Sequence, residues 1–225
     1  MSGDLQAVGL TALLAATTTL LLVPLASPLA WWLARSTSPS RSLIEAVVAM
    51  PLVLPPTVLG FYLLVMLNPE SAVGSLWVEL TGDSLTFSFS GLVIASIIYS
   101  LPFMVQPLQA ACRAVPESVL EAAATLGAPP RDRWLNVVLP MAKRGYLTGC
   151  VLTFAHTVGE FGVVLMMGGN IPGETRVLSI AIYEHVETLN YDAAHMLALG
   201  LLCFSFLSLW LVYRYAGHRF EVVRG

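Results

Sequence analysis

The sequence predicts an all-α polytopic membrane protein with five transmembrane helices, and three observations support this class. Hydrophobic residues make up 56% of the 225 residues and charged residues only 11%, about half the charged share of an ordinary soluble domain. The mean hydropathy is +0.76. The apolar residues also gather in runs long enough to cross a bilayer, roughly 20 residues each. The predicted spans are 7–34, 46–67, 87–111, 145–168 and 193–213.

The placement of the basic residues predicts the orientation of these spans. If the polar segment around Glu121 is cytoplasmic, ten of the eleven Lys and Arg residues lie on the cytoplasmic side and only Arg176 lies outside. Cytoplasmic loops of membrane proteins carry such an excess. We therefore expect one transmembrane domain over 1–225 in the cytoplasmic membrane, with the N-terminus outside and the C-terminus inside. The ten inner residues are Arg35, Arg41, Arg113, Arg131, Arg133, Lys143, Arg144, Arg214, Arg219 and Arg224.

The first apolar run ends in two tryptophans, Trp31 and Trp32. Tryptophans at this position are typical of the aromatic belt at a membrane interface. A cleaved signal peptide is the alternative for this run. Such a peptide needs a positively charged beginning, and no Lys or Arg precedes Arg35.

The second run contains a cluster of prolines, Pro51, Pro55 and Pro56, followed by Thr57. Proline removes a backbone hydrogen bond and cannot sit repeatedly inside an unbroken helix. Non-helical backbone at membrane depth is tolerated only against protein or a water-filled cavity. The cluster predicts a broken helix that lines a pathway, and a simple kink is the alternative.

The fourth run holds the only acidic residue deep inside an apolar segment, Glu160. On a helix, Thr153, His156, Thr157 and Glu160 share one face. An ionisable residue inside a span is a candidate functional residue. The alternative is that Glu160 lies near the outer end of the span, where water or a helix N-terminus satisfies it. His156 and Glu160 alone are too few for a metal site.

A polar segment at 117–140 separates the third and fourth spans. Ala, Leu and Glu favour helix from Ser118 onward, Gly127 with Pro129 and Pro130 predicts a break, and a second short helix is expected from Arg131 to just before Pro140. The segment is therefore predicted to form helix, turn, helix outside the bilayer.

The chain shows no sequence motif of an enzyme. It contains no Walker A, GxSxG or HExxH pattern. We therefore predict no catalytic residue, no metal, no cofactor and no nucleic-acid partner, and any pumping must draw on a partner protein or an ion gradient. Between the fourth and fifth spans, a turn-rich outer loop at 168–176 precedes 177–187, which is too short to span and is expected to be a re-entrant or surface helix.

The 117–140 segment resembles the EAA loop of binding-protein-dependent ABC importer permeases. The matching positions are Glu121, Ala122, Ala123, Gly127, Val137, Leu139 and Pro140. The resemblance implies a type I importer permease core, in which this loop forms coupling helices that dock on an ATP-hydrolysing subunit.

Three further stretches, 50–60, 159–162 and 169–176, resemble the molybdate branch of this family, and tungstate and sulfate permeases share parts of the pattern. The resemblance implies ATP-driven import of molybdate by a homodimer of this subunit, with two copies of an ATPase subunit and a periplasmic or surface oxyanion-binding protein. That protein is expected to dock on the outer loop through Asn170, Glu174 and Arg176.

For the pathway itself we expect a polar lining with few charges, because a tightly held dianion could not leave. The candidates are Pro55, Pro56, Thr57, Thr153 and Thr157, with Glu160 in a structural or gating role. A rival hypothesis is an ion-coupled secondary transporter that uses His156 and Glu160 for protons. It predicts inverted repeats, which the sequence does not show. A membrane scaffold is a third hypothesis, and it explains neither the prolines nor the polar face.

Overall fold

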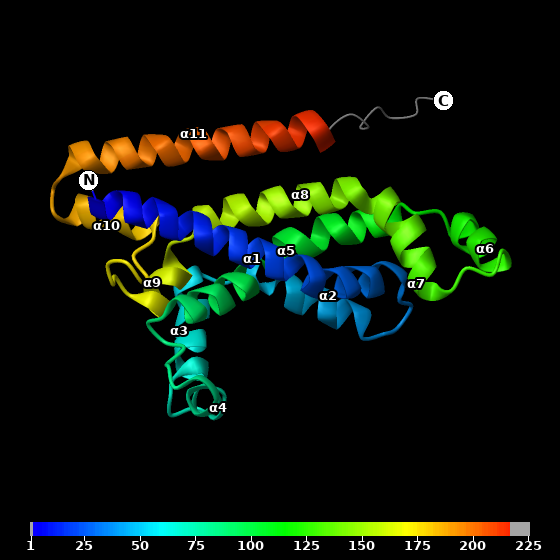
Figure 1. The fold of residues 1–225 in the computed structure, drawn as a ribbon, viewed down its shortest axis with the longest axis horizontal. Helices are drawn as coiled ribbons and strands as arrows, with labels where there is room; N and C mark the ends of the chain where they lie inside the picture. The colour runs from blue at the N-terminus through cyan, green and yellow to red at the C-terminus, as the bar shows by residue number, and fades with distance from the viewer. Residues whose placement is uncertain (1, 217–225) are drawn as a thin grey trace.

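The computed structural model describes residues 2–216, and every regular element among them is helical (Figure 1). The elements are α1 (Ser2–Arg35), α2 (Arg41–Ala49), a 3-10 turn (Met50–Leu52), α3 (Pro56–Leu67), α4 (Ala72–Thr81), α5 (Phe89–Arg113), α6 (Glu117–Thr125), α7 (Pro130–Arg133), a π turn (Trp134–Val138), α8 (Leu139–Val158), α9 (Gly162–Gly168), α10 (Leu178–Glu187) and α11 (Tyr191–Ala216).

The described residues contain three helices that are individually long and apolar enough to cross a membrane: Gly3–Arg35, Phe89–Arg113 and Tyr191–Arg214. Two bent pairs raise the number to five if each pair is one span. The prediction of an all-α membrane protein is confirmed. The second and fourth predicted spans, however, are not straight helices.

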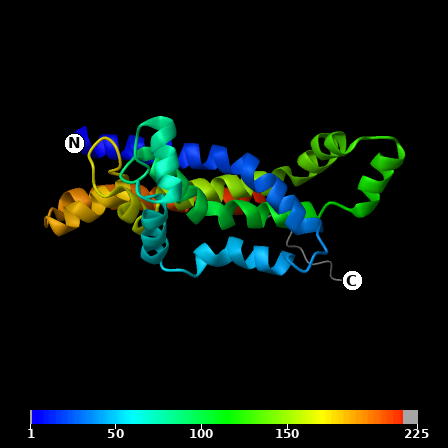
Figure 2. The same ribbon diagram turned by 90° about the horizontal axis from the view of Figure 1, so that it is seen from below.

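The second span is broken at the proline cluster, as the sequence predicts. The chain direction turns by 108° between Arg41–Leu52 and Pro56–Leu67, and Figure 2 shows α3 running across the direction of α2. The fourth span turns by 61° between Pro130–Val158 and α9. Glycine and glutamate occupy this second break, which has no proline.

The centre of the fold is a layer made by α1, α5 and α8, which pack along one another (Figure 1). Glycines on α8 bring its backbone close to α5. A Cβ on Gly145 would lie 2.4 Å from Ala111 Cβ, and one on Gly149 would lie 2.9 Å from Met104 Sδ. Small residues at such contacts are what membrane helices use to approach closely, because lipid provides no hydrophobic force between them.

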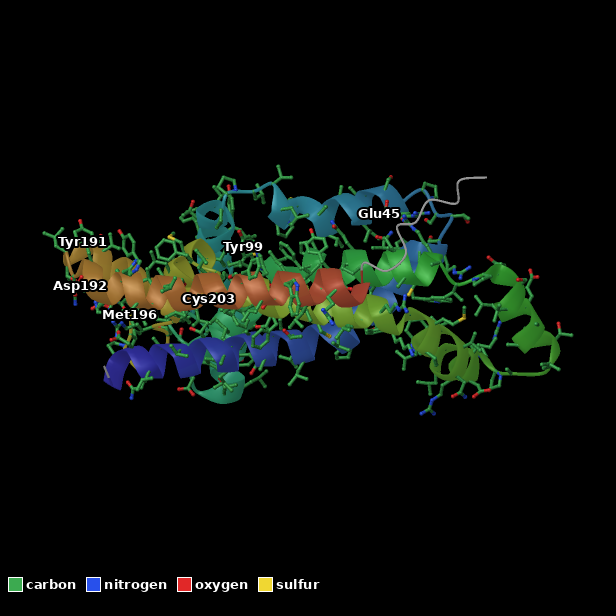
Figure 3. The ribbon with its side chains drawn as sticks, turned by 90° about the horizontal axis from the view of Figure 1, so that it is seen from above. Glu45, Tyr99, Tyr191, Asp192, Met196 and Cys203 are labelled. Atoms are coloured by element: carbon green, nitrogen blue, oxygen red, sulfur yellow. The ribbon has the colours of Figure 1, made fainter. Side chains whose placement is uncertain are left out.

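The last helix, α11, lies at the edge of this layer and contacts mainly α10 and α8. Only 6% of its most apolar window is buried inside the structure, against 56% for α5. Figure 3 shows Met196 and Cys203 along this helix, and both are exposed. Exposed apolar side chains over the length of a span are expected where lipid is the solvent.

The two ends of the layer differ in charge. The end of α1 at Arg35, the start of α2 at Arg41, the end of α5 at Arg113 and the 117–140 segment lie together at one end (Figure 1). The N-terminus, α9 and α10 lie at the other. The predicted separation of basic residues is thus present in the described chain, although Arg219 and Arg224 lie outside the described residues.

One helix was not expected from the sequence. The connection between α3 and α5 contains α4, which begins at an N-cap, where the Ser71 hydroxyl accepts a hydrogen bond from the Gly74 amide, and ends at Gly82 with φ +81°. These are a standard start and stop for a helix.

The close approach of α8 to α5 leads to the first prediction. Gly145→Ala should lower the midpoint of thermal unfolding of the detergent-solubilised protein, because the new methyl group also lies 2.9 Å from the Pro107 carbonyl oxygen and such overpacking costs about 1–3 kcal/mol. Gly200→Ala on α11 is the matched control. Nothing lies within 4 Å of its Cβ position, so this variant should be at least as stable as the wild type. Equal midpoints for the two variants would contradict the packing described here.

Candidate functional site

A hollow of about 550 Å³ opens between the two broken spans. Pro56 and Thr57 line it from the start of α3, Tyr99 from α5 and His156 from α8. Glu160, in the break between α8 and α9, completes the wall. Both breaks in the helices therefore meet at one place, where backbone at membrane depth faces a cavity, as its polar groups require.

Polar side chains join α5 to α8 beside this hollow. Ser100 Oγ lies 2.9 Å from His156 Nδ1 and 3.0 Å from Thr157 Oγ1. The His156 ring stacks on Phe103, with 4.0 Å between ring centroids. The polar face predicted on the fourth span thus exists, and it faces α5 of the same chain.

Glu160 is the most buried ionisable residue of this group, with 3% of its surface exposed. Its Oε2 accepts a hydrogen bond of 2.8 Å from Ser96 Oγ on α5. Its backbone carbonyl accepts one of 2.5 Å from Ser179 Oγ on α10. Oε1 has no hydrogen-bond partner among the described residues. The residue therefore ties the break between α8 and α9 to two other helices.

The predicted pathway residues fall into two groups. Pro56, Thr57 and Glu160 line the hollow, and Pro55 is exposed directly before them. Thr153 and Thr157 are buried and do not line it. The hydroxyl of Thr153 has no hydrogen-bond partner among the described residues.

The 117–140 segment forms the predicted helix, turn, helix and projects from one end of the layer (Figure 1). Gly127 ends α6 with φ +83°. The Ala128 amide donates to the Ala123 carbonyl and the Gly127 amide to the Ala124 carbonyl, which is the hydrogen-bond pattern of a glycine-terminated helix. Space for a side chain at Gly127 is open, so the backbone conformation alone favours glycine there.

The surface of this segment is unusually open for an ordered helix pair. No residue of α6 or α7 is buried, and Leu126 is 88% exposed. Glu121 and Ala122 are exposed and Ala123 is half-buried, while Leu139 and Pro140 are exposed where α8 begins. The residues of the EAA pattern thus lie mostly on an accessible surface, and Ala123 turns partly inward.

The expectation that the second short helix ends before Pro140 is wrong. The helix continues from Pro130 to Val158, with a π turn at Trp134–Val138 in which the Leu139 amide donates to the Trp134 carbonyl. Pro140 has no amide hydrogen to donate, and in a regular α-helix its ring would press on the carbonyl four residues back. The wider π turn gives the ring room.

The loop between α9 and α10 is held by an ionic network. Arg176 Nε lies 2.8 Å from Glu184 Oε2 on α10, and Arg176 Nη2 lies 3.5 Å from Asp4 Oδ1 on α1. Asn170 Nδ2 donates to the same Glu184 oxygen at 3.1 Å. The Arg176 side chain is only 12% exposed, whereas Glu174 is exposed. Of the three loop residues predicted to dock a partner, Arg176 and Asn170 thus both bond within the chain, although Asn170 stays exposed.

The sequence did not reveal the partners of Glu160, His156 and Arg176. Ser96 and Ser100 stand four residues apart in an apolar span, a spacing that puts both hydroxyls on one helix face and could have marked them. Glu184 and Asp4 carry no such local signal. The contact of Trp31 with Trp134, with ring centroids 5.2 Å apart, was also not predicted.

The fold and the site define the class of protein: a multi-pass transport permease, with broken spans around a hollow and an accessible helix pair at one end. The chain belongs to the family described as "Binding-protein-dependent transport system inner membrane component", whose sequence profile matches residues 26–218. It is therefore a multi-pass inner-membrane protein.

Curated relatives match most of the chain. The "Molybdenum transport system permease protein ModB" of Azotobacter vinelandii is 55% identical over 210 residues, which are 93% of this chain and 93% of that protein. The protein of the same name from Escherichia coli (strain K12) is 36% identical over 183 residues, 81% of this chain and 80% of that protein. The "Probable sulfate transport system permease protein cysT" of Marchantia polymorpha is 30% identical over 210 residues, 92% of this chain and 72% of that protein.

A solved structure supports the fold. A chain of a bacterial alginate ABC transporter, crystallised with an alginate pentasaccharide-bound periplasmic protein, matches with a TM-score of 0.73 at 16% identity, covering 93% of this chain and 77% of that one. At this identity the likeness concerns the fold alone.

The contact between Ser96 and Glu160 gives the second prediction. Ser96→Ala should lower the stability of the solubilised protein by about 1–3 kcal/mol, because it leaves a buried carboxyl without its hydrogen bond. The double variant Ser96→Ala with Glu160→Leu should recover most of this loss, since removing both partners of a buried hydrogen bond is nearly neutral. Thermal unfolding measures both, and a double variant less stable than Ser96→Ala alone would contradict the contact.

Proposed function

We propose that the protein is the permease subunit of an ATP-binding-cassette importer that carries molybdate across the inner membrane, with ATP hydrolysed by a partner subunit. The observation that carries the proposal is the 117–140 segment, an ordered helix pair with the EAA pattern and no buried residue in α6 or α7. The 55% identity to a protein named as a molybdenum permease supports the substrate.

The 117–140 segment is the docking site for the ATPase in this proposal. Glu121, Ala122 and Ala123 on α6, the turn at Gly127, and Leu139 and Pro140 form the surface that the partner grips. Because one helix runs from Pro130 through the π turn to Val158, a displacement of α7 can be carried along it to the break at Glu160. Closure of two ATPase copies on ATP would thus move the walls of the hollow.

The translocation pathway lies between two copies of this chain and includes the hollow at the broken spans. Thr57 is exposed there and offers a hydroxyl donor to an oxyanion, and Pro55 and Pro56 leave the neighbouring backbone non-helical. Thr153 and Thr157 support this wall from behind. Glu160 has a gating role: it links the break to α5 and α10 and does not bind the anion.

The outer end of the permease receives the substrate from a periplasmic or surface oxyanion-binding protein. Asn170 and Glu174 are exposed in the loop before α10 and are available to that protein. Arg176 acts indirectly, since its ion pairs with Asp4 and Glu184 fix the shape of the loop.

The substrate could instead be tungstate or sulfate, which resemble molybdate in shape and charge. The relative named for sulfate is 30% identical and those named for molybdenum reach 55%, which favours molybdate. Titration of the partner binding protein with all three anions by calorimetry measures the preference, and tighter binding of sulfate would overturn the choice of molybdate.

The rival hypothesis of a proton-coupled carrier places His156 and Glu160 on a proton path. Both residues are hydrogen-bonded to serines of α5, and the ordered 117–140 segment has no role in that scheme. A membrane scaffold likewise leaves the hollow between the broken spans unexplained.

Reconstituted vesicles test the proposal. Purified permease, ATPase and binding protein should take up radiolabelled molybdate only when ATP is present on the ATPase side. Uptake that persists without ATP or without the ATPase subunit would refute the ABC mechanism and favour ion coupling.

The third prediction concerns docking. Glu121→Lys should weaken assembly with the ATPase by more than about tenfold, because reversing a charge within an interface places like charges together or breaks a pair. Copurification and ATP-dependent uptake measure it. Glu79→Lys makes the same charge change on exposed α4 at the opposite end and should assemble normally. Normal uptake by Glu121→Lys would remove Glu121 from the docking surface.

A further inference from the structure

The last residue of α1, Arg35, holds the turn that joins α5 to the 117–140 segment. Arg35 Nη2 donates to the Val115 carbonyl at 2.6 Å and to the Cys112 carbonyl at 3.3 Å. Arg35 Nη1 also donates to Glu117 Oε2 at 3.1 Å. One guanidinium therefore binds one carbonyl in the last turn of α5, one in the connecting turn and the side chain of the first residue of α6.

These contacts combine favourable electrostatics with partial burial. A guanidinium at a helix C-terminus interacts well with the unpaired carbonyls and the negative end of the helix dipole. Hydrogen bonds from a charged donor are about twice as strong as neutral ones. The Arg35 side chain is 22% exposed, whereas Glu117 is 74% exposed. The carbonyl contacts are thus the stronger part, since exposed ion pairs contribute little.

Two tryptophans make a second contact between α1 and the same region. Trp31 lies one helical turn before Arg35, with the Arg35 guanidinium carbon 5.1 Å from its ring centroid. Its ring meets Trp134 edge to face, with centroids 5.2 Å apart. Trp134 is the first residue of the π turn. Both rings pack against a small buried cluster that includes Cys112 and Val138.

The two contacts lie at the two connections between the 117–140 segment and the spans. One is the turn between α5 and α6, which has no helical hydrogen-bond ladder of its own. The other is the π turn, whose hydrogen bonds span five residues and which interrupts the regular helix from Pro130 to Val158. The end of α1 therefore braces both connections between the segment and the spans.

We propose that Arg35, together with Trp31, is a positioning residue for coupling. It keeps the 117–140 segment rigid relative to α1, α5 and α8, so that a displacement imposed on α6 and α7 moves these spans as a unit and is not lost by bending at the two joints. This inference rests on the proposed function of the segment as the ATPase docking site.

The test measures molybdate transported per ATP hydrolysed, in vesicles that contain the whole complex and its binding protein. Arg35→Ala should still assemble and hydrolyse ATP, while the transported molybdate per ATP falls about twofold to thirtyfold, the usual range when coupling is disturbed away from the sites. Arg35→Lys keeps a charged donor and should lose less. Trp31→Phe keeps an aromatic contact with Trp134 and should transport more molybdate per ATP hydrolysed than Trp31→Ala.

Arg113→Ala is the matched control. It removes the same charge from the end of α5, but Arg113 binds Glu45 on α2, at 2.7 Å, and Figure 3 shows Glu45 on α2, away from the 117–140 segment. This variant should keep the ratio of the wild type. An equal loss in Arg113→Ala would make the effect one of charge alone and overturn the inference.

The remaining outcomes are also decisive. An unchanged ratio in Arg35→Ala, or uptake and hydrolysis that fall by the same factor, would assign Arg35 to folding or assembly only and overturn the inference. If Arg35→Ala yields no complex, the molybdate transported per ATP is read from Arg35→Lys and the two Trp31 variants. A lowered ratio in them supports the inference, and an unchanged ratio overturns it. A wild-type complex without ATP-dependent uptake would instead overturn the proposed function, and this inference with it.

Discussion

The close contact of α5 with α8 is the constraint on which the rest of the structure depends. Gly145 and Gly149 leave no room for side chains against α5, so the two helices meet almost backbone to backbone. At this distance short hydroxyl side chains can reach across, which is why Ser96 and Ser100 bond Glu160 and the polar face of α8. The same contact positions both ends of α8, one at the hollow and the other at the 117–140 segment.

Where a span is broken, the backbone groups that lose their helical partners must be satisfied in another way. The prolines before Thr57 remove helical hydrogen bonds on one side of the hollow. On the other side, the break at Glu160 is satisfied by Ser179, which donates to the Glu160 carbonyl from α10. Polar groups thus gather where the helices are interrupted, at the wall of the hollow.

The sequence predicted those features that depend on local chemistry: the apolar spans, the break at Pro55 and Pro56, and the helix pair whose first helix ends at Gly127. It could not predict contacts between distant residues. The polar face of α8 was recognised, but its partner helix was not, because only the packing at Gly145 selects α5. We expected a helix end before Pro140 because proline disfavours helical backbone in front of it. The π turn before Pro140 lets the helix continue all the same. The ion pairs of Arg176 with Asp4 and Glu184 were likewise not predicted, because these partners lie far from the loop in sequence or on the next helix.

Electron cryo-microscopy of the complete complex, without nucleotide and with ATP bound, tests most directly whether the 117–140 segment moves together with the rest of the helix that ends at Val158. We predict an unchanged angle across the π turn in the two states, with Arg35 still on the Val115 carbonyl, while the walls of the hollow separate or approach. A helix that bends at Trp134–Val138, or an Arg35 that releases the turn as ATP binds, would contradict it.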